Sequence, residues 1–432
     1  MKKPKSMKNN KILQVLTVRP FFYLLLSEVF SQLAMNMLNF VLVIIAFTVV
    51  RSNTAVSGVV LSFMIPSLLF GIVAGVIVDK KNKKNVLFLT NLLRGLFVLP
   101  LVLLNTNIFV IYIVTFIVAF ITQFFIPAET PIIPLLVRKD QLMSANALFG
   151  MGIYGSIFVA YALSGPVLLF FGRTNVFFVF GFLFLIGAFF ASLIKVKEPK
   201  KNKLSAKDVI HNLSLANEIK LAVAIMAKTK VIYKALFLLT LVQVIILTLA
   251  VIGPGYAQHI LRIRVEDFPF FFVTPAIVGM AFAAVILGSF FHNVSKVKIT
   301  KIGLVLLGFS IMLLPYGARV ESGIIAQTVN AYLPHFLKIN VFHIMIFLAF
   351  IMGIANALVF VPANTILQEE TTDEFRGKVY GALSTLVGLF SLLPIILVGS
   401  LADLIGIKGV LTGIGVVVLG IAGSRIIFFR GK

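Results

Sequence analysis

The chain has 432 residues, of which 60% are hydrophobic, and its mean hydropathy is +1.07. Soluble domains are only about half apolar, so a fold in water does not bury this much apolar surface. The sequence holds no cysteine and no tryptophan, which excludes disulfides and thiolate metal sites and leaves interfacial anchoring to Tyr, Phe, Lys and Arg. The composition therefore indicates an integral membrane protein.

Apolar runs close to the length of a membrane span recur along the whole chain. About 20 apolar residues in a helix cross the hydrocarbon core. The first run follows a basic segment at residues 1–20 and leads to no small-residue cleavage site, which predicts a retained helix rather than a signal peptide. The pattern predicts an all-α polytopic fold with twelve transmembrane helices and a tail at 430–432, the helices lying at 21–49, 55–78, 85–104, 108–126, 145–171, 175–194, 231–253, 270–291, 301–315, 341–361, 378–401 and 409–429.

The net charge of +23 is a value that nucleic-acid-binding proteins also reach. Its distribution argues against that class, because 30 of the 38 Lys and Arg fall on one side of the predicted topology and seven on the other. The one that remains, Arg94, lies within a helix. This asymmetry follows the positive-inside rule and predicts that both termini are cytoplasmic. Without a lipidation motif or organelle address, a bacterial-type plasma membrane is expected, with the bilayer as partner and no nucleic acid.

A long polar stretch at residues 195–230 separates six predicted helices from six. Within it, apolar residues recur at helical spacing, which predicts an amphipathic helix on the inner membrane surface; they are Leu215, Ile219, Val223 and Met226. The sequence thus predicts an N-terminal six-helix bundle at 21–194 and a C-terminal one at 231–429.

Internal similarity supports two related halves. Residues 126–130, placed after the fourth helix, match residues 361–365 after the tenth at an offset of 235, whereas 75–79 match 288–292 at an offset of only 213. The difference of 22 predicts an external insertion at about 317–340. Parallel six-helix halves are a transporter architecture, although two apolar halves also look alike by composition alone.

The segment after the second helix, residues 75–84, runs Gly-Val-Ile-Val-Asp-Lys-Lys-Asn-Lys-Lys. It resembles the loop signature of the major facilitator superfamily, with Asn82 in place of the usual glycine. We expect close helix packing at Gly75, capping of a neighbouring helix by Asp79, and attraction of the lysines to the anionic leaflet. An ordinary positive-inside loop is the alternative. The resemblance implies a gating role for Gly75, Asp79, Lys80, Lys83 and Lys84.

Within that superfamily, the chain is similar to the macrolide-efflux and siderophore-exporter branch, which implies an exporter. The similar stretches lie at 31–33, 91–95, 126–137, 145–148 and 375–379. Two departures stand out: Ala34 and Met35 replace an expected Gly-Asp, and the helix 5 motif keeps Gly165 and Pro166 but lacks two further glycines, with Tyr161 and Leu169 in their places.

Ionisable residues inside a membrane are costly and are functional candidates. Glu28 and Arg94 lie at similar predicted depths in helices 1 and 3. Glu28 either pairs with Arg94 or carries a proton; a static ion pair, or a carboxylate near the headgroups, is the structural alternative.

Uncharged polar groups on helices 1, 4, 7 and 10 are candidates for a substrate cavity. Helical spacing places Gln32, Met35 and Asn36 on the face of Glu28. The full set is Gln32, Met35, Asn36, Asn39, Gln123, Gln243 and Asn356. Few charges together with many Phe and Met suit apolar or amphiphilic substrates, although most Phe are expected to face lipid.

The sequence does not support a catalytic site. The five histidines show no metal-ligand spacing, and no nucleotide-binding loop is present. We therefore expect a monomeric secondary transporter without cofactors, driven by a proton gradient and exporting hydrophobic or amphiphilic molecules by alternating access. A lysophospholipid or other lipid transporter of the same fold is the alternative, and a membrane-embedded lipid-modifying enzyme is the alternative from another class.

Overall fold

The computed structural model describes residues 11–79, 81–196, 230–290, 294–317, 330, 340–371 and 373–428. The regular elements in this part of the chain are all helical, and eleven are long and apolar enough to cross a membrane. One of them, α9 (Leu142–Leu193), has 52 residues and is bent at Gly172, whose φ of +74° suits glycine. At 1.5 Å per residue it is about 78 Å long, enough for two crossings. The prediction of twelve crossings is confirmed.

The described chain divides by its contacts into two compact units, residues 1–49 with 61–217 and residues 50–60 with 218–432. Residues 50–60, which hold the start of α4, group with the second unit, whereas the sequence assigned them to the N-terminal bundle. The predicted amphipathic helix in 195–230, nearly all of the predicted insertion at 317–340, and the tail at 430–432 lie outside the described residues.

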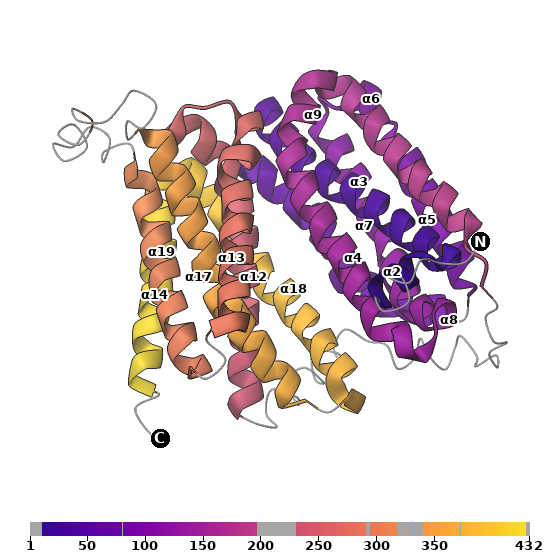
Figure 1. Cartoon of the computed structure of the whole chain (residues 1–432). Helices are drawn as coiled ribbons and strands as arrows, with labels where there is room; N and C mark the ends of the chain where they lie inside the picture. Colours follow the sequence, from indigo (N-terminus) through magenta and orange to yellow (C-terminus); the bar gives the residue numbers. More distant parts are fainter. Residues whose placement is uncertain are drawn as a thin grey trace. The chain divides into compact units, whose positions relative to one another are not determined.

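The first unit is built from long helices joined by short turns (Figure 1). Its elements are α2 (Lys11–Leu16), α3 (Arg19–Val50), most of α4 (Asn53–Asp79), α5 (Lys83–Val98), α6 (Leu101–Leu104), α7 (Ile108–Glu129), η1 (Thr130–Ile132), α8 (Ile133–Leu136), η2 (Lys139–Gln141) and α9. Helix α5 packs against both α7 and α9. These contacts bring charged residues of separate helices together.

The second unit has its own core, centred on α12 and α17. Its elements are α12 (Lys230–Tyr256), the π-helical turns η3 (Ala257–Leu261) and η5 (Pro269–Val273), η4 (Val265–Asp267), α13 (Thr274–Phe290), α14 (Lys296–Leu313), η6 (Leu314–Tyr316), α17 (Val341–Glu369), α18 (Asp373–Leu404) and α19 (Ile407–Phe428). Helices α14, α17 and α19 run side by side (Figure 1). A Cβ added at Gly353 of α17 would lie 1.8 Å from the carbonyl oxygen of Ala276 in α13, so this close packing requires glycine.

Helices α7 and α17 continue past the prolines at which the sequence predicted their ends. The Pro-Ala segments at 126–130 and 361–365 were expected after the helices, but α7 continues through Pro127 to Glu129 and α17 continues through Pro362 to Glu369. Proline is tolerated inside transmembrane helices because neighbouring groups satisfy the freed carbonyl. The consequence is that Glu129 belongs to a spanning helix.

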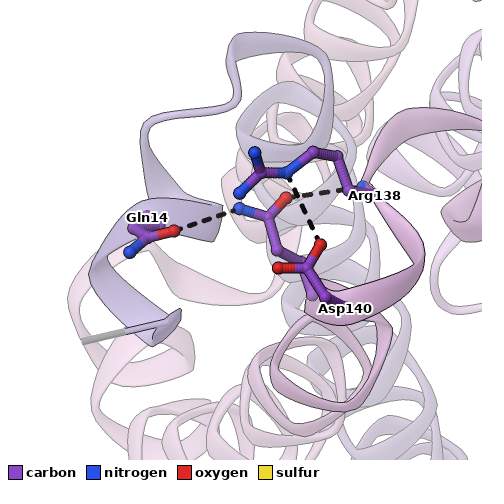
Figure 2. A network of polar contacts seen from close by, with 4 residues as sticks. Gln14, Arg138 and Asp140 are labelled. Atoms are coloured by element: carbon purple, nitrogen blue, oxygen red, sulfur yellow. Dashed lines mark hydrogen bonds and ion pairs between the residues drawn. The ribbon is translucent and has the colours of Figure 1, made fainter. Parts of the chain in front are cut away.

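The N-terminal segment folds back onto the end of the first unit. Val15 of α2 is fully buried in the apolar cluster that also holds Phe21 and Leu24. Figure 2 shows the polar contacts beside it: the Gln141 side-chain amide donates to Gln14 Oε1 over 3.5 Å, and Arg138 forms an ion pair with Asp140. The basic segment predicted at 1–20 is therefore, from Lys11 onward, part of the bundle.

Candidate functional site

Three buried charged residues meet inside the first unit. Glu28 of α3 and Arg94 of α5 are each 1% exposed, and Glu129 of α7 is 7% exposed. Electrostatic interactions join all three, because Arg94 interacts with both carboxylates and Glu129 interacts with Glu28. We call these three residues the charged cluster.

Hydrogen bonds at Ser27, the residue before Glu28, connect α3 to α9 and to α5. The Ser27 hydroxyl of α3 donates to the carbonyl oxygen of Gly187 in α9 over 2.9 Å, and the Asn91 amide of α5 donates to Ser27 Oγ over 3.5 Å. Glu28 is the tenth residue of α3, roughly 14 Å from the helix start. The cluster therefore lies at the same end of the unit as the buried Val15.

The guanidinium of Arg94 is held by neutral groups. Its terminal nitrogen donates to Ser31 Oγ and to Asn91 Oδ1, both over 2.8 Å, and its Nε donates to the carbonyl oxygen of Thr90. Its carbon lies 4.3 Å from the ring centre of Phe125 and 4.9 Å from that of Phe184, in the geometry of cation–π contacts. The described carboxylates make no direct ion pair with Arg94, so the close Glu28–Arg94 pair considered from the sequence is replaced by longer-range attraction.

The two carboxylates of the cluster are incompletely hydrogen-bonded. Glu28 Oε1 accepts from the Gln32 amide over 2.8 Å, but Glu28 Oε2 and Glu129 Oε2 are buried and have no hydrogen-bond partner among the described residues. With both carboxylates ionised, the cluster has a net charge of −1. An uncompensated charge in a buried site costs several kcal/mol, so the arrangement favours binding of one positive charge.

The predicted face of α3 forms a hydrogen-bonded series. The Asn36 amide donates to Gln32 Oε1 over 3.1 Å, and Gln32 in turn donates to Glu28. The spacing of four residues that the sequence showed therefore places these side chains in contact.

The other predicted cavity residues of the first unit make no hydrogen bond to the charged cluster among the described residues. The Thr122 hydroxyl of α7 donates to the carbonyl oxygen of Val118 over 2.8 Å, and its oxygen lies 3.8 Å from Met35 Sδ of α3. Gln123 is buried and donates to the carbonyl oxygen of Ala119 on its own helix. Asn39 is half-buried and makes no side-chain hydrogen bond with the described residues.

The predicted residues of the second unit are uncharged and half-buried. Gln243 lies on α12, and Asn356 lies on α17 with a buried Oδ1 that lacks a partner among the described residues. From α12 to α19, the buried polar residues that the structure describes all carry hydroxyl groups: Thr240, Thr248, Thr300, Ser310 and Ser391 on helices, and Thr371 between α17 and α18. Among the described residues, the buried site that contains both carboxylates and a guanidinium therefore lies in the first unit.

The loop motif is only partly described. A Cβ added at Gly75 would meet no described atom within 4 Å, so the close packing expected there is not what the structure shows. Lys83 is buried, Lys84 is half-buried, and the side chains of Asp79 and Lys80 lie outside the described residues. Asn82, which replaces the usual glycine, caps α5 by accepting from the backbone N–H of Asn85 over 3.0 Å. In the helix 5 motif, Gly165 is buried and Pro166 is exposed within α9.

A carboxylate cap of the expected kind occurs elsewhere, within the second unit. Asp403 of α18 accepts from the backbone N–H groups of Asn53 and Thr54 at the start of α4, over 2.9 and 3.0 Å, and from the Ser52 hydroxyl. Asp403 also lines an open pocket of about 670 Å³ together with Arg51, His259 and Lys408, all exposed. Because the carboxylate is committed to capping and the cations are exposed, this pocket is secondary to the charged cluster.

The residue that the sequence interpretation missed is Glu129. It stood in a stretch already singled out, but outside the predicted helix. Ser31 and Asn91, the partners of Arg94, likewise lay in the stretches similar to the exporter branch. If the fourth predicted helix had been extended through its proline, Glu129 would have been placed in the membrane. The described residues contain no group of three or more His, Asp or Glu suited to a metal ion.

The sequence model of the Major Facilitator Superfamily matches residues 24–332, more than half of the chain. The chain belongs to the Major Facilitator Superfamily. It is also 24% identical over 380 residues to the uncharacterized MFS-type transporter YfiS of Bacillus subtilis (strain 168), covering 85% of this chain and 83% of that protein. This superfamily member is thus a multi-pass membrane transporter and not an enzyme.

Solved structures of superfamily-like transporters share the fold. The nucleoside transporter NupG aligns with a TM-score of 0.70 at 12% identity, covering 96% of this chain and all of that one. A POT family transporter in complex with 5-aminolevulinic acid also aligns with a TM-score of 0.70, at 15% identity, covering 95% and 96%. At these identities the likeness concerns the fold alone.

Proposed function

We propose that this superfamily member is a proton-coupled exporter of hydrophobic or amphiphilic small molecules, of the macrolide-efflux type. The observation that carries the proposal is the charged cluster, in which two buried carboxylates lie near one guanidinium and each has one buried oxygen without a hydrogen-bond partner among the described residues. One proton bound between Glu28 and Glu129 neutralises the cluster and supplies the missing hydrogen bond.

The neighbourhood of the cluster supports a substrate of low polarity. The described residues that follow Glu28 along its face of α3 are uncharged, and Met35 lies among them. A polarisable thioether beside a few amides suits a molecule with an apolar body and a small polar group. Export by alternating access, a plasma-membrane location with cytoplasmic termini, and a monomer that needs no cofactor complete the proposal.

The test is transport in inverted membrane vesicles with an imposed pH gradient, measuring accumulation of a macrolide and of a lipophilic dye. We expect gradient-dependent accumulation that Glu28→Gln and Glu129→Gln each reduce at least tenfold. Glu370→Gln is the matched control, because this carboxylate is exposed at the end of α17 and lies outside the cluster.

Three results would contradict the proposal. Absence of any accumulation would refute drug export. Accumulation that persists unchanged in both cluster variants would refute the proton role of the cluster. Accumulation of a fluorescent lysophospholipid in place of dye and macrolide would reassign the protein to lipid transport.

A further inference from the structure

A directed series of hydrogen bonds runs along one face of α3. The Gln32 side-chain amide donates to Glu28 Oε1 over 2.8 Å, and the Asn36 side-chain amide donates to Gln32 Oε1 over 3.1 Å and to the Gln32 carbonyl oxygen over 2.8 Å. We call Glu28, Gln32 and Asn36 the polar ladder. Each of these hydrogen bonds is donated in the direction of Glu28.

The ladder divides the two oxygens of Glu28 between two tasks. Oε1 accepts from Gln32, whereas Oε2 is buried and unpartnered, on a carboxylate that interacts with Glu129. A donor on Oε1 stabilises the ionised carboxylate. A proton on Glu28 is therefore favoured on Oε2, and any change in the strength of the Gln32 hydrogen bond alters how tightly that proton is held.

The far end of the ladder is open. Asn36 is half-buried and stands eighth in sequence after Glu28, roughly 12 Å farther along α3. Its amide nitrogen is committed to Gln32, whereas its Oδ1 accepts no hydrogen bond from the described residues. An acceptor in this position is available to an N–H or O–H group of a bound molecule.

We infer that Gln32 and Asn36 are positioning residues that couple a hydrogen-bond donor bound at Asn36 to the proton held by Glu28. The inference rests on the proposed function. A donor on Asn36 Oδ1 polarises the amide, which strengthens its bond to Gln32 and, in turn, the bond from Gln32 to Glu28. The ionised carboxylate is stabilised and the proton leaves, so substrate binding releases a proton, as antiport requires.

The other charged groups that act on Glu28 are Arg94 from α5 and Glu129 from α7. Helix α9 reaches the neighbouring Ser27 through the carbonyl oxygen of Gly187, an uncharged group. Gln32 and Asn36 contact neither Arg94 nor Glu129 by any hydrogen bond among the described residues. Their substitution thus changes the ladder and leaves the composition of the charged cluster unaltered.

The test is a pH titration of the purified full-length protein by infrared spectroscopy, without any substrate. The carbonyl-stretch band of protonated carboxyl groups is followed, and the difference between wild type and Glu28→Gln isolates the band of Glu28. The variants are Gln32→Leu and Asn36→Leu. The matched control is Thr48→Val, because Thr48 is also half-buried on α3 but its hydroxyl donates to the carbonyl oxygen of Ile45 in its own helix.

We expect Gln32→Leu to move the Glu28 midpoint to higher pH by about one unit, the value of one lost hydrogen bond to a charged group. Asn36→Leu shifts it in the same direction by less, and Thr48→Val leaves it in place. If leucine lowers the yield of folded protein, Gln32→Met, with an unbranched side chain of similar length, and Asn36→Ala, with a smaller one, replace the two variants.

An unchanged midpoint in the Asn36 variant, with or without a shift in the Gln32 variant, would overturn the coupling and leave the proton site intact. A difference spectrum with no titrating Glu28 band would overturn the proposed proton site as well. The two failures are therefore distinguishable.

Discussion

Replacement of Arg94 by methionine tests whether the charged cluster is held together by its single cation. The side chain is 1% exposed, donates to Ser31, Asn91 and the Thr90 carbonyl, and lies over two phenylalanine rings. Methionine keeps most of the volume but leaves two buried carboxylates without a positive charge. Removing one charge from a buried set of opposite charges leaves the others uncompensated and costs about 3–5 kcal/mol. We expect a loss of this size in the free energy of unfolding.

The assay is the fraction of monodisperse protein that survives heating, measured by size-exclusion chromatography. The chain contains no cysteine, so dyes that react with exposed thiols cannot report its unfolding. We expect a smaller surviving fraction for Arg94→Met than for wild type, because the buried carboxylates then lack a compensating cation. Adding Glu129→Gln to Arg94→Met removes one of the two charges and restores part of the stability.

Arg94→Lys is the matched control for charge. Lysine retains the positive charge but not the planar group that reaches two acceptors and both rings, so we expect a loss between those of wild type and Arg94→Met. Equal stability of the Lys and Met variants would refute the electrostatic account. So would a double variant that is no more stable than Arg94→Met alone.

Three further substitutions test the packing around the site. Asp403→Ala removes the cap of α4 and is expected to lower the free energy of unfolding by about 1–3 kcal/mol, as measured in a thermal-stability assay. Asn107→Ala is the control and is expected to cost less, because the cap that Asn107 forms on α7 has only two donors. An equal loss in the two variants would contradict this. Gly353→Leu is expected to yield no monodisperse protein on chromatography, whereas Gly420→Leu, where a Cβ would meet nothing within 4 Å, is expected to behave as wild type. Val15→Ala is expected to cost roughly 1–3 kcal/mol in the same thermal assay, and no loss would show that α2 does not belong to the core.

The sequence predicted the number of crossings because each span depends on its own hydropathy, which needs no knowledge of neighbouring helices. It also predicted that Gln32 and Asn36 share the face of Glu28, since side chains four residues apart in a helix are adjacent whatever surrounds them. The hydrogen bonds along α3 confirm that spacing. The capping role expected at Asp79 stays a prediction.

Tertiary structure alone decided which groups surround the charges. Helical depth placed Glu28 and Arg94 at one level, but only helix packing set the Arg94 guanidinium against Ser31 of α3, Phe125 of α7 and Phe184 of α9. Asn91, by contrast, lies one turn before Arg94 on the same helix. Helix packing likewise brought Glu129 into the cluster, because neighbouring helices permit α7 to continue through Pro127. The hydropathy of a segment determines whether it enters the bilayer, because each span must itself be apolar enough to cross the hydrocarbon core. The partners of a buried charge depend on helices distant in sequence, which no local pattern records.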